Sequence, residues 1–244
     1  MPARLSAWGN LGWPAAAKAL RMTNRAAALP DVEDTLLPYG NGRSYGDVCL
    51  NPGATLLQMR GLDCFIRFDA ASGVLHCESG VLLADILAVF VPRGWFLPVT
   101  PGTRHVTVGG AIANDVHGKN HHAAGSFGAH VRSFELLRSD GSRLRCAPDE
   151  NPAWFAATLG GLGLTGVITT VALQLRPVAG NSIAVENRRF VGLDEFFARN
   201  AEAESRHEYT VAWIDCLAKT PRGVLISGQH SDAEWRRAHC DQRR

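Results

Sequence analysis

Short apolar runs separated by glycine and aspartate dominate the chain between residues 54 and 79. They are "ATLLQM" at 54–59, "CFIRFD" at 64–69 and "GVLHCES" at 73–79. Their length and the turn-forming residues between them are typical of β-strands. We therefore expect the first strands of a sheet in this region.

The stretch "LLADILAVFVPRG" at 82–94 changes to helical spacing, and Pro92 and Gly94 are typical of a helix end. One wide apolar stripe of this helix comprises Leu82, Leu83, Ile86, Leu87, Val89 and Phe90. We expect shorter helices at 15–21 and at 151–161, where Asn151 is a candidate N-cap residue.

The pair Asp140-Gly141 lies between two apolar runs of residues 131–146 and predicts a hairpin. The long β-branched stretch "GVITTVALQLRPV" at 166–178 predicts a strand. After Gly180 the pattern becomes strand, helix, strand, so we expect a second domain from about residue 180.

The composition is that of an ordinary globular protein, with 46% hydrophobic and 20% charged residues. A net charge of +2 argues against nucleic acid as the main partner. The longest apolar run is interrupted by Asp85 and is too short to span a membrane. The N-terminus does not resemble a signal peptide. We expect a cytoplasmic protein with at most a peripheral association with membranes. The six cysteines form no Cys-x-x-Cys pair, which disfavours a zinc or redox motif.

The stretch "GNGRSYG" at 40–46 is the first glycine-rich segment. It lacks the lysine of a Walker loop, and its glycine spacing differs from that of a Rossmann turn. If Gly40 and Gly42 adopt positive φ, the loop directs successive N–H groups into one concavity. An ordinary strand-to-loop turn remains the alternative for this segment taken alone.

The stretch "PGTRHVTVGGAIAND" at 101–115 is the second glycine-rich segment. Thr107 is a candidate N-cap, and Gly109 and Gly110 each cost the helix about 1 kcal/mol relative to alanine. We expect the start of this helix to offer free N–H groups to an anion. Two separate cradles of this kind suit a pyrophosphate-bridged dinucleotide better than a single phosphate.

Four motifs give the chain a specific resemblance to a known family: "GNGRSYGD", "PGTRHVTVGGAIANDVHGKNHHAAGSFGAHV", "DGSRLRC" and "GGLGLTGVI". They resemble the PCMH-type FAD-binding domain of the vanillyl-alcohol oxidase superfamily, and within it the decaprenylphosphoryl-ribose oxidases. The resemblance implies an α+β fold, with an FAD-binding domain of two α+β subdomains at residues 1–178. The start of a substrate domain follows at 179–244. The family's chains are longer, so we expect a chain truncated at its C-terminus.

The resemblance also implies which residues contact FAD. These are Gly40, Asn41, Gly42, Arg43, Ser44, Tyr45, Gly102, Thr103, Thr107, Val108, Gly109, Gly110, Asn114, Asp115, Val116, His117 and Val167. Asn114 stands where the family has cysteine or another small residue. Many relatives bond FAD covalently to a histidine of the first loop. Arg43 precedes Ser44 here, and because a guanidinium cannot form that bond we expect non-covalent FAD.

The segment "VHGKNHH" at 116–122 carries the candidate catalytic residues. The resemblance places His117 and Tyr45 beside the flavin and the substrate, where a histidine can bind a hydroxyl during hydride loss. It places Lys119 toward a substrate phosphate. Spacing of His117, His121 and His122 also allows a metal site, but Gly118 and Lys119 disfavour it, and we expect none.

The implied reaction is oxidation of the 2′-hydroxyl of a polyprenyl-phosphate pentose by FAD. A separate short-chain reductase would then complete an epimerisation. Two alternatives stay open. The first is an FAD-linked oxidase of another sugar alcohol or of a 2-hydroxy acid. The second is a flavin-binding remnant without catalytic activity.

Overall fold

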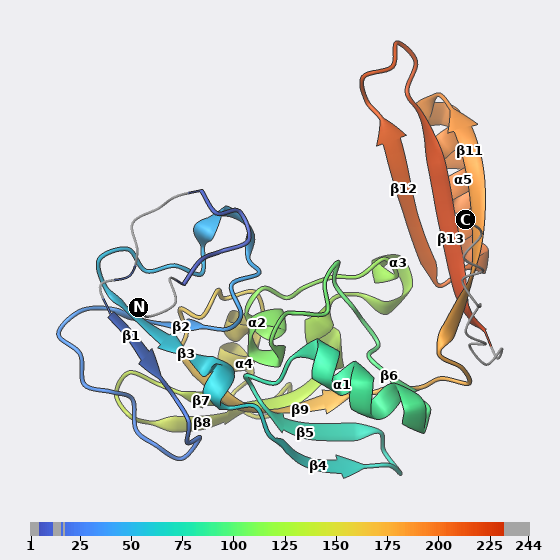
Figure 1. Ribbon diagram of the computed structural model, residues 1–244. Coiled ribbons are helices and arrows are strands. Elements are labelled where there is room, and N and C mark those ends of the chain that lie inside the picture. Colours follow the sequence, from blue (N-terminus) through green and yellow to red (C-terminus); the bar gives the residue numbers. More distant parts are fainter. Residues whose placement is uncertain (1–4, 12–15, 17, 232–244) are drawn as a thin grey trace, which may run out of the picture.

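The computed structural model describes residues 5–11, 16 and 18–231, and it shows two parts (Figure 1). The larger part holds two main sheets and a group of helices, and the smaller part is a three-stranded sheet with one helix that projects from one end. Helices and strands are mixed throughout, as expected of an α+β fold.

A five-stranded antiparallel sheet forms the base of the larger part (Figure 1). In spatial order its strands are β4 (Phe65–Asp69), β5 (Val74–Glu78), β9 (Val167–Gln174), β7 (Val131–Leu137) and β8 (Arg143–Cys146). The strands expected at 64–69, 73–79 and 166–178 and the hairpin at Asp140-Gly141 are therefore confirmed. β9 is central, and most of its side chains are buried on both faces.

Three helices pack on this sheet and close the main core. They are α1 (Leu83–Phe90), α2 (Val108–Ala113) and α4 (Pro152–Thr158). Ile86 of α1 and Ile112 of α2 share one buried apolar cluster with Leu173 of β9. Phe134 of β7 stacks on Phe155 of α4, with ring centroids 5.4 Å apart. Contacts of this kind fix the helices, and thus the loops before them, relative to the sheet.

A second, parallel sheet lies beside the first. It consists of β1 (Lys18–Arg21), β3 (Thr55–Gln58) and β2 (Leu36–Tyr39), with β3 in the middle. The helix expected at 15–21 is therefore wrong for Lys18–Arg21, because pairing with β3 overrides the helical propensity of its sequence. Ala15 lies outside the described residues.

Short elements connect these layers. They are the 3-10 turns at Tyr45–Asp47, Met59–Gly61, Val91–Arg93 and Phe127–His130, the helix α3 (His121–Ala124), and the pair β6 (Trp95–Phe96) and β10 (Arg176–Pro177). Asn151 precedes α4 as expected, but its side chain caps nothing there and donates instead to the Arg145 carbonyl at 2.7 Å.

The smaller part has the strand order β11-β13-β12. It comprises β11 (Ser182–Val191), α5 (Leu193–Arg206), β12 (Tyr209–Asp215) and β13 (Arg222–Ser231). The expected strand, helix, strand order is confirmed, and β13 completes the sheet. Phe190, Leu225 and Ala203 form the small core between the sheet and α5. Among the described residues, no helix is both long and apolar enough to cross a membrane.

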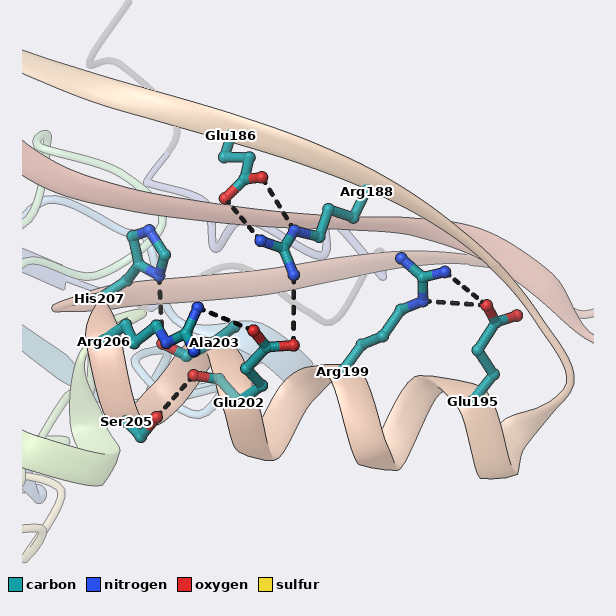
Figure 2. Close-up of polar contacts among 9 residues, drawn as sticks. All are labelled: Glu186, Arg188, Glu195, Arg199, Glu202, Ala203, Ser205, Arg206 and His207. Atoms are coloured by element: carbon teal, nitrogen blue, oxygen red, sulfur yellow. Dashed lines mark hydrogen bonds and ion pairs between the residues drawn. The ribbon is translucent and has the colours of Figure 1, made fainter.

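Ion pairs hold α5 to its face of the sheet (Figure 2). Arg188 of β11 donates to Glu186 at 2.9 Å and pairs with Glu202 of α5 at 3.3 Å. Arg206 pairs with Glu202 at 2.9 Å, one helical turn away. These groups are substantially solvent-exposed, so they add little stability beyond that of the apolar core between α5 and the sheet.

Candidate functional site

A pocket of about 540 Å³ opens where the two sheets of the larger part meet α2. Most of its walls come from three segments that are distant in sequence, namely residues 38–49, 101–117 and 162–168. Both glycine-rich stretches of the sequence therefore face the same space. The two stretches therefore act together, because neither encloses a ligand alone.

The loop after β2 presents backbone donors to this pocket. Gly42 has φ of +62°, the left-handed region that an L-residue rarely adopts. No described residue accepts a hydrogen bond from the N–H groups of Asn41, Gly42 or Arg43. The Arg43 guanidinium folds back and donates to the Asn41 carbonyl at 2.9 Å. A braced turn with unpaired N–H groups is suited to an anion.

Gly40 allows close packing against Thr107, whereas we expected it to adopt positive φ. Its φ is not positive, but a Cβ there would lie 2.5 Å from Oγ1 of Thr107. The loop can approach the start of α2 only because residue 40 has no side chain. Asn41 adds a second link by donating to the His105 carbonyl at 2.7 Å. The two glycine-rich segments are thereby fixed to one another.

The start of α2 does not supply free donors, and that expectation is wrong. Val108 N–H donates to the Val81 carbonyl, Gly109 N–H to the Ser79 carbonyl, and Gly110 N–H to Oγ1 of Thr107. Thr107 is thus the N-cap residue, as expected. The end of β5 takes the donors that the sequence assigned to a ligand, since Gly109 lets the helix lie directly on Ser79.

The nearby segment at Gly102 and Thr103 remains open. No described residue accepts a hydrogen bond from either N–H group. A Cβ added at Gly102 would meet no atom within 4 Å. Together with the Asn41–Arg43 turn, this segment forms the second half of an anion cradle. The helix start contributes the shape of the pocket, whereas the two loops contribute the donors.

The rest of the pocket wall is largely apolar. Met59, Val106, Val116 and Ile168 line its interior. Its rim carries large apolar side chains that are unusually exposed, namely Trp8, Tyr45, Val48 and Leu162. Burial raises the pKa of the Cys49 thiol, another wall residue, which favours the neutral thiol. Apolar walls beside an anion cradle fit a flat heterocycle joined to phosphate.

Most of the expected FAD contacts lie in this pocket, but three do not. Val108, the first residue of α2, is buried in the main core, and Val167 is buried in the apolar cluster around Leu57. Gly166 and Ile168, on either side of Val167, line the pocket instead. Asp115 accepts a hydrogen bond from Gly128 N–H at 2.8 Å and so holds the turn that precedes β7.

Several wall residues were not expected from the sequence. They are Trp8, Pro38, Val48, Cys49, Met59, Ser79, Pro101, Val106, Ala113, Leu162, Gly163, Gly166 and Ile168. The motif "GGLGLTGVI" was the available signal for the last group. Pro101, Val106 and Ala113 lie within the motif "PGTRHVTVGGAIAND". The others are mostly apolar residues outside the quoted motifs, and the folded chain alone brings them to the pocket.

The segment that carries His117 and Lys119 divides the site in two. His117 lines the first pocket, whereas Lys119 lines a second pocket of about 390 Å³. Gly118 is buried between them, where a Cβ would lie 2.9 Å from the Thr100 carbonyl. Pro101 and Gly102 belong to both pockets, so the two are adjoining spaces.

The second pocket lies between the two parts of the chain. Phe96, Thr100 and Lys119 line it from the larger part, and residues of all three strands of the smaller sheet line it from the other side. Lys119 is exposed and pairs with no acidic group among the described residues. The pocket therefore combines apolar walls with one unpaired cation.

A polar network holds the smaller part in place. Arg176 of β10 contacts Oε1 of Glu208 at 2.6 Å and donates to the Tyr209 hydroxyl at 3.0 Å. That hydroxyl lies 3.0 Å from Nε2 of His230. Thr210 N–H donates to the Lys119 carbonyl at 2.9 Å. These contacts connect β12 and β13 to the segment that carries the candidate catalytic residues.

Burial sets the protonation state of this network. It raises the pKa of Tyr209 well above its usual value, and together with the Arg176 charge it lowers the pKa of His230. A neutral imidazole at His230 can accept the Tyr209 proton in a hydrogen bond. Arg176 and Glu208 are then the charged pair of the junction.

Two other histidines of this region make local contacts. A ring nitrogen of His121 lies 3.2 Å from the Gly118 carbonyl, and one of His130 lies 2.9 Å from the Ala124 carbonyl. Within the described part of the chain, no group of three or more histidine, cysteine or acidic residues is arranged to hold a metal ion.

The residues present fit an FAD molecule. Unpaired N–H groups at Asn41–Arg43 and at Gly102–Thr103 suit a pyrophosphate. The buried Ser79 hydroxyl, which has no partner among the described residues, faces the same pocket. Val116 and Ile168 offer flat apolar contact for a ring system. The pocket therefore combines donors for a pyrophosphate with apolar walls for a ring system, as a dinucleotide requires.

Comparisons with known proteins agree with this geometry. A family described as FAD binding domain matches residues 14–147. The chain is 39% identical over 191 residues to the decaprenylphosphoryl-beta-D-ribose oxidase of Mycolicibacterium smegmatis. This match covers 77% of this chain and 41% of that protein. It is 44% identical over 157 residues to an uncharacterised Streptomyces coelicolor protein, covering 63% of this chain and 42% of that one.

An alditol oxidase of a Streptomyces species is also similar, with 31% identity over 137 residues, 56% of this chain and 32% of that protein. The chain thus spans about two fifths, or less, of the length of these relatives.

Proposed function

The chain belongs to the FAD-binding domain family, with FAD as its cofactor, and we propose from this premise that it forms the flavin-binding part of an oxidase that acts on an alcohol group. One observation carries the proposal. The pocket that fits FAD and a second pocket with an unpaired cation adjoin at Pro101 and Gly102.

The loops of the first pocket hold the cofactor. Asn41, Gly42 and Arg43 would offer backbone N–H groups to the pyrophosphate, and Gly102 and Thr103 would add further donors from the same pocket. Asn114, Val116 and His117 also line this pocket, and His117 is two residues from Lys119 of the second pocket, so this part of the wall would face the isoalloxazine ring. Bound FAD supplies a hydride acceptor.

His117 binds the hydroxyl of the substrate and takes its proton as hydride leaves the carbon. It is exposed at the wall of the first pocket and precedes Gly118 at the boundary of the second. A histidine in that place is suited to general-base work near neutral pH. Tyr45 is 79% exposed at the rim and offers a hydroxyl for binding the same substrate.

Lys119 binds a phosphate of the substrate in the second pocket. Because Gly118 separates it from His117, the two side chains serve adjoining spaces. The substrate class that fits is a phosphorylated pentose whose free hydroxyl reaches the first pocket. We assign it as a polyprenyl-phosphate pentose, in agreement with the name of the Mycolicibacterium relative, and we place the oxidation at its 2′-hydroxyl. A separate short-chain reductase would complete the epimerisation.

This proposal gives each part of the chain a role. Residues 1–178 form the FAD-binding domain, with its two sheets as two subdomains, and residues 179–244 belong to a substrate domain. A second candidate function is oxidation of a sugar alcohol without phosphate, which the similarity to alditol oxidase favours. The unpaired Lys119 in the second pocket supports the phosphorylated substrate over this candidate.

The test is anaerobic reduction of the FAD-loaded protein by two substrates, farnesylphosphoryl-ribose and xylitol. We expect the flavin absorbance to bleach with the first and not with the second. His117→Gln should slow bleaching at least about 100-fold, the usual range for loss of a general base. His130→Gln is the matched control, because His130 contacts Ala124 away from both pockets. Bleaching by xylitol alone would favour the alditol reading, and an unchanged rate in His117→Gln would remove the proposed base.

A further inference from the structure

Leu162 has a backbone conformation that is unusual for its residue type. Its φ is +53°, in the left-handed region where the Cβ of an L-residue comes too close to a neighbouring carbonyl oxygen. Asparagine and aspartate tolerate this region better. Every other non-glycine residue with positive φ in the described part of the chain is one of these two types, namely Asn10, Asp47, Asp115 and Asn151. Leu162 therefore carries backbone strain without a side chain suited to the conformation.

The turn around Leu162 is held by its neighbours, so the strained conformation is imposed on it. The Leu162 N–H group donates to the Ala113 carbonyl, at the end of α2, at 2.8 Å. The next residue, Gly163, packs so closely on β2 that an added Cβ would lie 2.9 Å from Cγ of Pro38. Leu162 cannot relax without disturbing the contacts of this turn with α2 and β2.

Core packing does not compensate for the strain. The Leu162 side chain is 43% exposed, and it belongs to none of the apolar clusters that the described residues form. It lines the first pocket instead. Leu164, two residues farther along, is 79% exposed and lines neither pocket. Within this turn, Leu162 is thus the large apolar side chain that faces the pocket.

The neighbouring wall residues show what the Leu162 side chain adds. Gly163 and Gly166 line the same part of the pocket without side chains of their own. Leu162 and Ile168 therefore supply the apolar surface of this segment. An aliphatic side chain of this kind packs well on the flat face of a ring, because both lose apolar surface to water.

We propose that Leu162 packs against a ring of bound FAD, and that its strained backbone conformation is what places it there. The inference rests on the proposed placement of FAD in the first pocket, but it involves neither the substrate nor the reaction. The contact exists only when FAD is bound, whereas the strain is present with and without the cofactor. Loss of the side chain and relief of the strain should therefore have separate consequences.

Two substitutions at this residue separate them. Leu162→Ala removes the contact and keeps a Cβ at positive φ, whereas Leu162→Gly removes both the contact and the strain. We expect both variants to bind FAD at least about fivefold more weakly. We expect Leu162→Gly alone to raise the Tm of the cofactor-free protein, by about 2 °C or more. Titration by flavin fluorescence and thermal unfolding without FAD are the measurements.

Two further variants are the controls. Leu162→Met keeps a long apolar side chain and should hold the affinity for FAD within about twofold of the parent protein. Leu164→Gly makes the same substitution two residues away, outside the pocket, and should leave the affinity unchanged. It should not raise the Tm, because Leu164 does not have positive φ.

Three results would overturn the inference. The first is an unchanged affinity for FAD in Leu162→Ala. The second is a lower Tm of the cofactor-free protein in both Leu162→Ala and Leu162→Gly, which would make Leu162 a packing residue. The third is a dimer in sedimentation that Leu162→Ala disrupts, because a second copy of the chain would then cover the side chain.

The same experiments separate this inference from the proposed function. If the Leu162 variants behave as expected but farnesylphosphoryl-ribose does not bleach the flavin, the contact stands and the proposed reaction fails. Bleaching by that substrate together with an unchanged affinity for FAD in Leu162→Ala has the opposite meaning. A parent protein that binds no FAD would overturn both.

Discussion

The two larger antiparallel sheets of the protein differ in how completely they are covered. In the five-stranded sheet, β9 has partners on both sides, and most of its side chains are buried. In the smaller sheet, most β11 side chains are exposed and α5 covers one face only. The first sheet is a scaffold that positions loops around a pocket. The second leaves the face opposite α5 open.

The largest expected effect separates these two roles by stability. Leu173 of β9 is fully buried, so Leu173→Ala should lower the free energy of unfolding by about 2–5 kcal/mol. Val185→Ala on the open face of β11 should change it by less than about 0.5 kcal/mol. Urea unfolding of both variants measures the difference. Equal losses would show that the open face is packed in solution.

The next effect concerns the pocket that the scaffold supports. In Gly42→Ala, the new Cβ would lie 2.1 Å from the Ser6 carbonyl oxygen, at a backbone φ that disfavours alanine. We expect a cost of about 1–3 kcal/mol in stability and at least a tenfold loss of FAD affinity. Titration with FAD by fluorescence quenching measures the affinity.

Gly141→Ala is the matched control for this change. Gly141 also has positive φ, but a Cβ there meets no atom within 4 Å. Its stability should fall by about 1 kcal/mol while its FAD affinity remains that of the parent protein. Equal losses of FAD affinity in the two variants would show that positive φ alone, and not the pocket, explains the effect.

A smaller effect tests the junction between the two regions. Glu208→Gln removes the charge that Arg176 contacts and should cost about 1–2 kcal/mol. The Thr210 amide, which donates to the Lys119 carbonyl, should then exchange with deuterium more rapidly. Glu202→Gln, which removes the ion pair between α5 and Arg188 of β11, should leave that exchange rate unchanged (Figure 2). Similar exchange in both variants would mean that the network does not fix the smaller sheet.

The smallest effect is a pH dependence at the same junction. Burial and the Arg176 charge lower the pKa of His230 in the folded protein, so the unfolded chain binds a proton first as pH falls. His230 therefore contributes stability above its unfolded pKa of about 6.5, which is lost as pH falls below that value. The difference should be less than about 1 kcal/mol, and His230→Gln should remove it. Thermal unfolding between pH 7 and pH 5 is the measurement.

Sequence patterns predicted the scaffold better than the ligand contacts. The strands at 54–79, the hairpin at Asp140-Gly141 and the N-cap at Thr107 depend on local chemistry, and the structure confirms them. The helix predicted over Lys18–Arg21 was wrong, because pairing with β3 makes this segment a strand. Local sequence does not show such a distant partner.

The pocket shows the same limit. Spacing alone suggested that the N–H groups at Gly109 and Gly110 were free, but folding directs one to the Ser79 carbonyl and the other to the Thr107 side chain. The resemblance to a family placed His117 and Lys119 in one motif. Only the fold shows that they line two adjoining pockets. The open face of β11 and β13 also depends on register, which the sequence leaves unspecified.

The central claim is that the two loops around Gly42 and Gly102 hold FAD without a covalent bond. The most direct test is to load the purified protein with FAD, remove unbound cofactor and record the visible spectrum before and after acid precipitation. The account predicts flavin absorbance in the native protein and its complete release into the acid supernatant, because Arg43 offers no atom for a flavin bond. Protein that retains no flavin, or a pellet that stays yellow after acid, would contradict it.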